Sequence, residues 1–264
     1  MKLRTLALAV ALTVCAVPAF AVGSLADVTI YDRASGRILP TYFSDGRWYV
    51  AGKPGNEYEI RIRNQSGGDV LAVTSVDGVN VVSGETAAPG QTGYVLASGS
   101  YLPIKGWRKD MSKVAAFYFT RLDDSYAART GRPDNVGVIG VAVFRRKVEP
   151  PVVLEDERSR RDDSAADSAA GNAGAASAPA PRPSARAESA QLQKSLGTGH
   201  GRIQTSQVRY TNFERASETP DEVVAIWYDS RVNLAARGVI PAPVPAPRDP
   251  QPFPANFVPD PPPR

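Results

Sequence analysis

Residues 56–63, which read Asn56-Glu57-Tyr58-Glu59-Ile60-Arg61-Ile62-Arg63, decide the fold class of this chain. Polar and apolar side chains alternate with a period of two, so they lie on opposite faces of an extended backbone. An antiparallel strand has this pattern when one face packs on a core and the other meets water. The stretch therefore predicts a half-buried β-strand.

Strand signals continue on both sides of this stretch. Residues 69–76 place Val70, Ala72, Thr74 and Val76 on one face, and Asp77-Gly78 is a strong tight-turn signal before a strand at 79–82. The apolar runs at 114–119 and 138–144 are nearly continuous, which favours central positions in a sheet. These two runs lie in the strand candidates 113–120 and 136–144, and two more candidates are 48–50 and 93–97.

About eight short strands separated by Gly, Asn, Asp and Pro turns predict an all-β domain at 25–150. An antiparallel β-sandwich or jelly-roll-like arrangement suits this number of strands and this length. Strands do not alternate with helices here, so a doubly wound parallel sheet is not expected.

The first 21 residues have the pattern of a signal peptide. Lys2 and Arg4 precede an apolar stretch, and Ala19-Phe20-Ala21 is a small-x-small cleavage site. Cleavage after Ala21 removes Cys15, the only cysteine, so the mature chain is expected to hold no disulfide or thiolate. A lipoprotein signal ending at Cys15 is the weaker alternative. No later stretch is long enough for a transmembrane segment, and we expect a periplasmic or secreted protein.

Two further segments are poor in the residues that build a core. Residues 151–190 combine mixed charges with Ala, Gly, Ser and Pro, and the stretch from 145 to 209 contains no aromatic residue other than His200. Such a segment cannot offset the entropy of ordering, so a disordered linker is expected. Residues 241–264 hold 11 of the 23 prolines and predict a disordered, Pro-rich tail.

Residues 191–240 have a different organisation. Strands are expected at 203–210 and 222–228, followed by a helix at 231–237 that Asp229-Ser230 caps and Gly238 ends. Two strands and a short helix bury too little surface to fold alone. We therefore expect this strand-strand-helix segment to dock on the sandwich and extend one of its sheets.

Several motifs resemble a family of exported proteobacterial proteins, and the resemblance covers both ordered pieces but neither the linker nor the tail. It supports the division of the chain and implies no activity, substrate or catalytic residue. The motifs lie at 75–81, 93–96, 106–108, 125–131, 135–144, 197–201, 213–217, 228–230 and 233–234.

His200 is the only histidine, and it lies in the glycine-rich run Gly197-Thr198-Gly199-His200-Gly201. Imidazole titrates near neutral pH and suits a general base, for which Asp229 would be a carboxylate partner. No nucleophile elbow, Ser-x-x-Lys pair, dinucleotide fingerprint or phosphate loop accompanies it. One histidine without cysteine also argues against zinc, so no cofactor or metal is expected. The favoured interpretation is a glycine-rich turn whose histidine forms a hydrogen bond with a neighbouring strand.

The loop at 122–135 is the second candidate site. Asp123, Tyr126, Arg129 and Arg132 have the chemistry to recognise a carboxylate, a phosphate or sugar hydroxyls. The favoured interpretation is a structured crossover, in which Arg129 pairs with an aspartate and Tyr126 packs on the edge of the sandwich. Calcium held by Asp123, Asp124 and Asp134 is the weaker alternative, because their spacing matches no 12-residue calcium loop.

Three tryptophans form a third candidate. Trp48, Trp107 and Trp227, with Tyr42 and Tyr101, suit either core packing, which we favour, or a glycan-binding platform. Charge indicates little about partners, since the mature chain carries 29 basic and 27 acidic residues. The basic runs at 145–147 and 158–161 are short, and we expect no nucleic-acid partner.

These features predict an exported, non-enzymatic β-sandwich that acts as a binding or assembly module of the bacterial cell envelope. Its partner is expected to be another protein or an envelope component. The alternatives are a hydrolase that uses His200 with a carboxylate, and a glycan-binding module. Convergence of His200 with Asp229, Asp123 and Arg129 in one open cleft would favour the enzyme.

Overall fold

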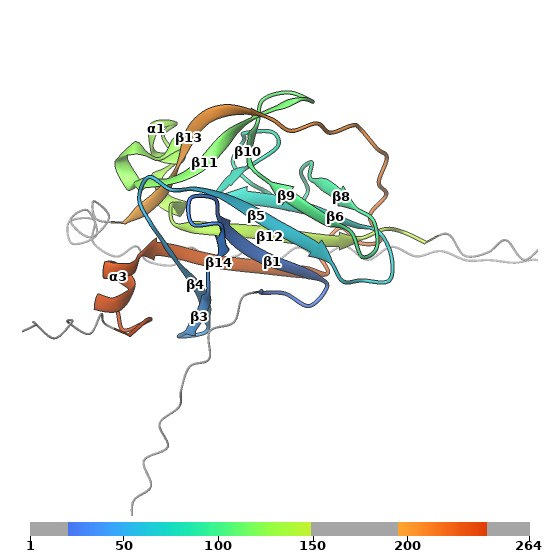
Figure 1. Ribbon diagram of the computed structural model, residues 1–264. Helices are drawn as coiled ribbons and strands as arrows, with labels where there is room; N and C mark the ends of the chain where they lie inside the picture. Colours follow the sequence, from blue (N-terminus) through green and yellow to red (C-terminus); the bar gives the residue numbers. More distant parts are fainter. Residues whose placement is uncertain (1–20, 149–194, 242–264) are drawn as a thin grey trace, which may run out of the picture.

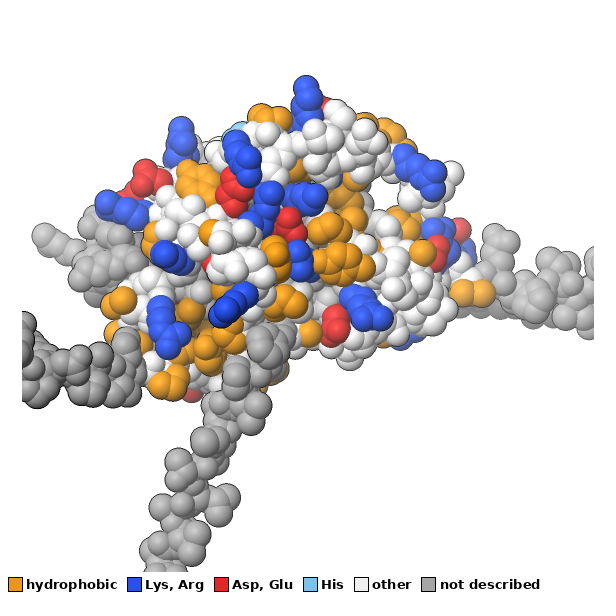
Figure 2. Space-filling model, viewed as in Figure 1, with side chains coloured by type: hydrophobic (Ala, Val, Ile, Leu, Met, Phe, Trp, Pro, Cys, Tyr) orange, Lys and Arg blue, Asp and Glu red, His pale blue; other side chains and the backbone are white. Residues whose placement is uncertain are grey.

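The computed structural model describes residues 21–148 and 195–241, which form a sandwich of two β-sheets (Figure 1). Basic, acidic and apolar side chains are interspersed on the face seen in Figure 2. The predicted all-β fold is confirmed. The predicted linker and nearly all of the predicted signal peptide and tail lie outside the described residues. Within the described ranges, no helix combines the length and the apolar character needed to cross a membrane.

The first sheet, named here the β5 sheet, has seven strands. They are β1 (Ala26–Asp32), β2 (Arg37–Ile38), β5 (Glu57–Asn64), β9 (Tyr101–Ile104), β10 (Gly106–Arg108), β11 (Lys113–Arg121) and β13 (Leu196–Thr205). The neighbours run β10-β11-β5-β1-β2, while β13 pairs with β11 and β9 pairs with β5.

The second sheet, named the β12 sheet, also has seven strands. They are β3 (Thr41–Ser44), β4 (Arg47–Gly52), β6 (Val70–Val76), β7 (Val79–Asn80), β8 (Tyr94–Leu96), β12 (Val138–Arg145) and β14 (Glu222–Ser230). The neighbours run β3-β4-β14-β12-β6-β7, and β8 pairs with β6. One pair, β14 with β4, is parallel, so this sheet is mixed rather than purely antiparallel.

The strand predicted from the alternation at 56–63 is confirmed as β5. Tyr58, Ile60 and Ile62 are fully buried between the sheets, and each such burial stabilises the fold by roughly 1.5–3 kcal/mol. The Asp77-Gly78 turn is confirmed as well, because both residues have a positive φ, +52° and +73°. The two apolar runs occupy central positions: β12 lies between β14 and β6, and β11 has strand partners on both edges.

Short helical turns connect these strands at two places. The loop at 122–135 contains the 3₁₀ turns Leu122–Asp124 and Pro133–Asn135 and the helix α1 (Tyr126–Arg129). The helix α3 (Arg231–Ala236) confirms the C-terminal prediction. The Ser230 side chain accepts a hydrogen bond from the Asn233 amide, and Gly238 has a φ of +72° just beyond the end of the helix.

The C-terminal piece is part of both sheets. As predicted it joins the sandwich, but β14 lies in the interior of the β12 sheet, between β4 and β12, rather than at an edge. The expected strand at 203–210 is wrong, because β13 begins at Leu196 and ends at Thr205. This strand pairs with β11 from Lys113 to Arg121 and includes the whole glycine-rich run.

Glu222 anchors the first described residues to the C-terminal piece. Its carboxylate accepts hydrogen bonds from the backbone N–H groups of Ser24, Leu25 and Ala26 and from the Ser24 hydroxyl. Burial opposes ionisation of Glu222, but these donors outweigh it and lower its pKa. The residues just before β1 are therefore tied to the start of β14.

Candidate functional site

His200 lies in a strand, not in the turn expected from its glycine neighbours. It is opposite Phe117 of β11, and its ring centroid is 5.6 Å from that of Tyr126. The turn prediction is wrong because these glycines serve close packing rather than chain reversal. A Cβ on Gly199 would lie 2.2 Å from the Tyr118 ring, and a Cβ on Gly197 would lie 2.5 Å from the Ser125 Cβ.

Three of the predicted binding residues gather around a fourth, Tyr126. The ring of Trp107 is 4.9 Å from that of Tyr126, the Arg132 guanidinium carbon is 6.0 Å from the Tyr126 ring centre, and His200 lies on the same ring. Trp107 is 3% exposed and donates to the Gly199 carbonyl, so it holds β13 in place rather than facing a ligand. Tyr126 packs here as the favoured interpretation of the loop predicted. The expected pairing of Arg129 with an aspartate is wrong, because Arg129 is exposed and forms no ion pair with a described residue.

The surroundings of His200 are cationic. Burial lowers the pKa of the imidazole, and the nearby positive charges of Lys109 and Arg129 lower it further. A group with this environment is neutral at pH 7. The described neighbours identified by these contacts supply aromatic and cationic groups, and none of them is a carboxylate.

Asp229 and Asp123 lie away from this cluster. The Asp229 carboxylate accepts hydrogen bonds from the backbone N–H groups of Leu196 and Ser230 and from the side-chain amide of Asn233. Leu196 precedes His200 by four residues, which is on the order of 13 Å along an extended strand. Asp123 is exposed and lies 3.8 Å from Arg121. The structure therefore does not bring His200 together with either carboxylate.

The aromatic residues considered as a glycan platform do not share one surface. Trp48 packs toward the core between the sheets, whereas Trp227 packs with Tyr42 on the outer face of the β12 sheet. Trp107 is buried, and Tyr101 lies on β9 of the other sheet. Asp124 and Asp134 belong to exposed 3₁₀ turns, and the described residues contain no group of three or more metal-ligating side chains close enough to hold an ion.

Asp77 forms a buried polar network that local patterns do not reveal. Its carboxylate accepts from the Tyr228 hydroxyl and from the N–H groups of Gly137 and Thr198, at 2.9 and 2.8 Å. The Thr198 hydroxyl lies 2.7 Å from the hydroxyls of both Tyr58 and Tyr228. Burial raises the pKa of Asp77 to about 6, although these hydrogen bonds oppose the change. The network joins both pieces of the chain inside the core.

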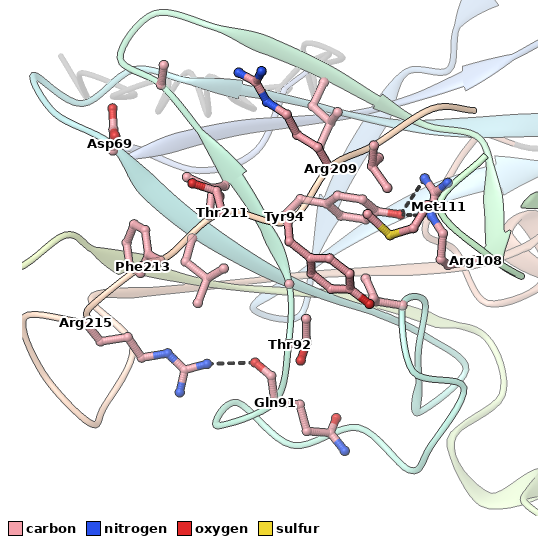
Figure 3. A pocket seen from close by; sticks show the side chains of 18 of the residues that line it. Asp69, Gln91, Thr92, Tyr94, Arg108, Met111, Arg209, Thr211, Phe213 and Arg215 are labelled. Carbon is pink, nitrogen blue, oxygen red and sulfur yellow. Dashed lines mark hydrogen bonds between the residues drawn. The ribbon is translucent and has the colours of Figure 1, made fainter. Parts of the chain in front are cut away.

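A large cavity lies elsewhere, beneath the segment that links β13 to β14. We call residues 206–216 the strap, and the cavity of about 1010 Å³ under it the strap groove. Figure 3 shows the strap passing from Arg209 through Thr211 and Phe213 to Arg215, with Tyr94, Thr92 and Gln91 on another wall. The remaining walls come from β10 and the turn after it, the start of β6 and the end of β12.

Cations are concentrated in the strap groove. Its lining has five cationic side chains and two acidic ones, a net charge of +3, although the mature chain as a whole is nearly balanced. Only Arg146 forms an ion pair there, 3.2 Å from Asp69. The other cations, which have no ion pair with a described residue, are Arg108, Lys109, Arg209 and Arg215.

The arginines of the groove have different tasks. All five N–H groups of Arg108 are used, on Tyr94, Asp110 and Ser206, so this residue fixes the strap and adds charge without a free donor. Arg215 donates to the carbonyls of Gly90 and Gln91 and keeps further donors. The Arg209 side chain is exposed and makes no hydrogen bond to a described residue. Arg209 and Arg215 are therefore placed to bind an anion.

Sequence reasoning missed this site because its cations come from separate segments of the chain. Arg146 lies in the short basic run at 145–147, but no local pattern joins this run to the other cations. Residues 206–210 of the strap were also expected to form part of a strand. Comparison of the chain with family models, with curated protein sequences and with solved structures finds no match. The geometry of the groove therefore carries the functional argument.

Proposed function

We propose that this chain is an exported, non-enzymatic binding or assembly module of the cell envelope that holds an anionic partner in the strap groove. The observation that carries the proposal is the net charge of +3 in a cavity of about 1010 Å³. A cavity of this volume lies at the upper end of the range of ligand pockets, which is roughly 300–1,000 Å³. An anion entering it would meet Arg209 and Arg215 without first displacing a carboxylate.

The geometry around His200 favours this proposal over the hydrolase. A general base needs a substrate-facing position and an orienting partner within hydrogen-bond reach. His200 packs on Tyr126 beside two cations, and Asp229 uses its carboxylate to hold the start of β13 and the cap of α3. The glycan-binding alternative loses its platform, since Trp48 and Trp227 pack on opposite faces of the sheet.

Export is the part of the proposal that the N-terminal pattern supports. Residues 1–21 have the basic start, apolar stretch and small-x-small end of a signal peptide. N-terminal sequencing of the protein recovered from the envelope fraction tests this directly. We expect the mature chain to begin at Val22, and an intact Met1 would contradict export through this signal.

Binding of simple anionic probes to the mature chain tests the groove. The probes are inorganic polyphosphate, a sulfated oligosaccharide and polyglutamate, with polylysine as the cationic control. At least one anion should bind, more weakly as salt is raised. The double variant Arg209→Glu/Arg215→Glu should lose at least about tenfold in affinity, because charge reversal introduces repulsion at the site.

Arg37→Glu is the matched control, since Arg37 is an exposed arginine on β2 and does not line the groove. Thermal unfolding of each variant checks that the fold is kept. If no anionic probe binds, or if the double variant binds as well as Arg37→Glu, the groove is not an anion site.

A further inference from the structure

The strap groove runs along the edge of a strand. β8 pairs with β6 on one side and has no strand partner on the other among the described residues. Tyr94 and Val95 are consecutive, so their side chains point to opposite faces of β8. Both line the groove. A cavity that reaches both faces of a strand must pass along its edge.

The strap bridges the two sheets over this edge. At its first end Ser206 and Val208 donate to the carbonyls of Ser112 and Met111, beside the β5 sheet. At its second end the backbone N–H of Lys147 donates to the Glu214 carbonyl. The backbone N–H of Ala216 donates to the carbonyl of Arg145 at the end of β12. Between 209 and 213, no backbone–backbone hydrogen bond to the described chain is made. Apart from the Asn212 carbonyl, which accepts from the Arg146 side chain, the strap therefore presents a second stretch of backbone with no described hydrogen bond across the groove from β8.

Apolar and cationic side chains occupy different parts of the groove. Val95 and Phe213 pack on a buried cluster that includes Leu71 and Phe144, which gives an apolar floor. The guanidinium group of Arg215 lies 4.4 Å from the centre of the Phe144 ring, while Arg209 is exposed on the strap. Figure 3 shows Phe213 and Arg215 following each other along the strap, with Arg209 beyond Thr211.

We propose that the strap groove binds an extended acidic peptide segment of a partner protein, which adds as a strand between β8 and the strap. The inference rests on the proposed function and names the class of its anionic partner. Strand addition uses backbone hydrogen bonds for affinity and alternating side chains for specificity. Here one face of the added strand meets the apolar floor and its acidic side chains meet the cations.

An extended peptide fits these features better than other anions. The groove also carries the rings of Tyr94 and Tyr210, on which a base or a sugar could stack. Neither a nucleic acid nor a sugar, however, presents the alternating N–H and C=O groups that pair with the edge of a strand. An exposed strand edge also tends to pair with another chain unless it is protected. Only a polypeptide satisfies both the unpaired backbone and the positive charge.

Fluorescence anisotropy with four labelled probes tests this inference on the mature chain. The first is a ten-residue peptide in which Glu alternates with Val. The second replaces each Glu by Lys, and the third carries N-methyl groups on alternate backbone amides of the first. The fourth is a ten-nucleotide oligothymidylate. The Glu peptide should bind, its N-methylated form at least about tenfold more weakly, and the Lys peptide not measurably.

The variant Arg209→Glu should weaken binding of the Glu peptide at least about tenfold, while Arg37→Glu should leave it unchanged. Amide hydrogen exchange at residues 93–97 should slow when the peptide is bound, because the edge of β8 becomes paired. Such protection would not follow from charge attraction alone.

Three outcomes would overturn the inference. The Glu peptide fails to bind, its N-methylated form binds equally well, or the oligonucleotide binds more tightly and depends on Arg209. In each case the anion-binding proposal is judged separately by polyphosphate and the sulfated oligosaccharide. A chain that binds those probes but no peptide keeps the proposed function and loses strand addition.

Discussion

Asp77 combines a turn conformation with a buried carboxylate. Its positive φ and the following glycine make the turn between β6 and β7, while its side chain enters the core and meets Tyr228 and Thr198. Asparagine also tolerates this backbone conformation. The variant Asp77→Asn therefore changes the charge while keeping the turn.

Asp77 should make the fold more stable in mild acid. Its folded pKa of about 6 lies above the ordinary value of 3.8, so the folded chain holds the proton more tightly than the unfolded chain. The stabilisation is complete below the unfolded pKa and is lost as pH rises through the folded pKa. The free energy of unfolding of wild type relative to Asp77→Asn should be about 2 kcal/mol larger at about pH 4.5 than at about pH 7.5.

Chemical denaturation at both pH values measures this difference. Asp45→Asn is the control, because Asp45 also has a positive φ in an Asp-Gly turn but is exposed. It should change stability little at either pH. An Asp77→Asn difference that is the same at both pH values would contradict the proton-binding argument.

The glycines of β13 should differ in their tolerance of alanine. At Gly197 the new Cβ would meet the Ser125 Cβ, which the backbone holds in place, and at Gly199 it would meet the Tyr118 ring. The partly exposed Tyr118 side chain can swing away by rotation about its Cα–Cβ bond, whereas the Ser125 Cβ moves only with its backbone. Gly197→Ala should therefore be the more destabilising variant, with a cost of about 1–3 kcal/mol. Thermal unfolding of the two variants compares them, and equal losses would contradict the difference in rigidity.

At the scale of the element, α3 depends on its cap. The Ser230 hydroxyl accepts a hydrogen bond from the backbone N–H of Asn233 in the first turn of this six-residue helix. We expect Ser230→Ala to lower the free energy of unfolding by about 1 kcal/mol, since it leaves that amide without its acceptor. Ser35→Ala in an exposed turn is the control for loss of a serine hydroxyl. Equal effects of the two variants in urea denaturation would argue against the cap.

The strap depends on Arg108 in a way that charge alone does not supply. Its planar group donates to both the carbonyl and the hydroxyl of Ser206 and to the hydroxyl of Tyr94. Arg108→Lys keeps the charge but loses the fork of donors. Amide hydrogen exchange at Ser206 and Val208 should become roughly tenfold faster, because these amides anchor the strap. Lys109→Arg, at the exposed neighbouring position, should leave it unchanged.

For the whole molecule, the position of β14 means that the first piece of the chain should not fold alone. Removing it would separate β4 from β12 and expose the core side chains Val224, Ile226 and Tyr228. A chain of residues 22–150 should therefore lack a cooperative thermal transition. Adding a chain of residues 191–240 should restore one, and a cooperative transition of 22–150 alone would contradict this.

Much of the architecture could be predicted from local patterns. The alternation at 56–63, the apolar runs of β11 and β12, the Asp77-Gly78 turn and the cap and end of α3 all depend on neighbouring residues. The turn predicted for the glycine-rich run is wrong because glycine serves two purposes. It permits a positive φ, and it permits close approach, and only the positions of Tyr118 and Ser125 show that the second applies here.

The all-β class, most strand positions and the joining of the C-terminal piece to the sandwich follow from local patterns, because periodicity and turn chemistry act over a few residues. The place where the charge gathers follows from tertiary contacts instead. Arg108, Arg146, Arg209 and Arg215 come from three separate parts of the chain and meet because the strap crosses from one sheet to the other. Electrostatic fields act through space rather than along the chain, so a nearly balanced sequence folds into a groove with a net charge of +3.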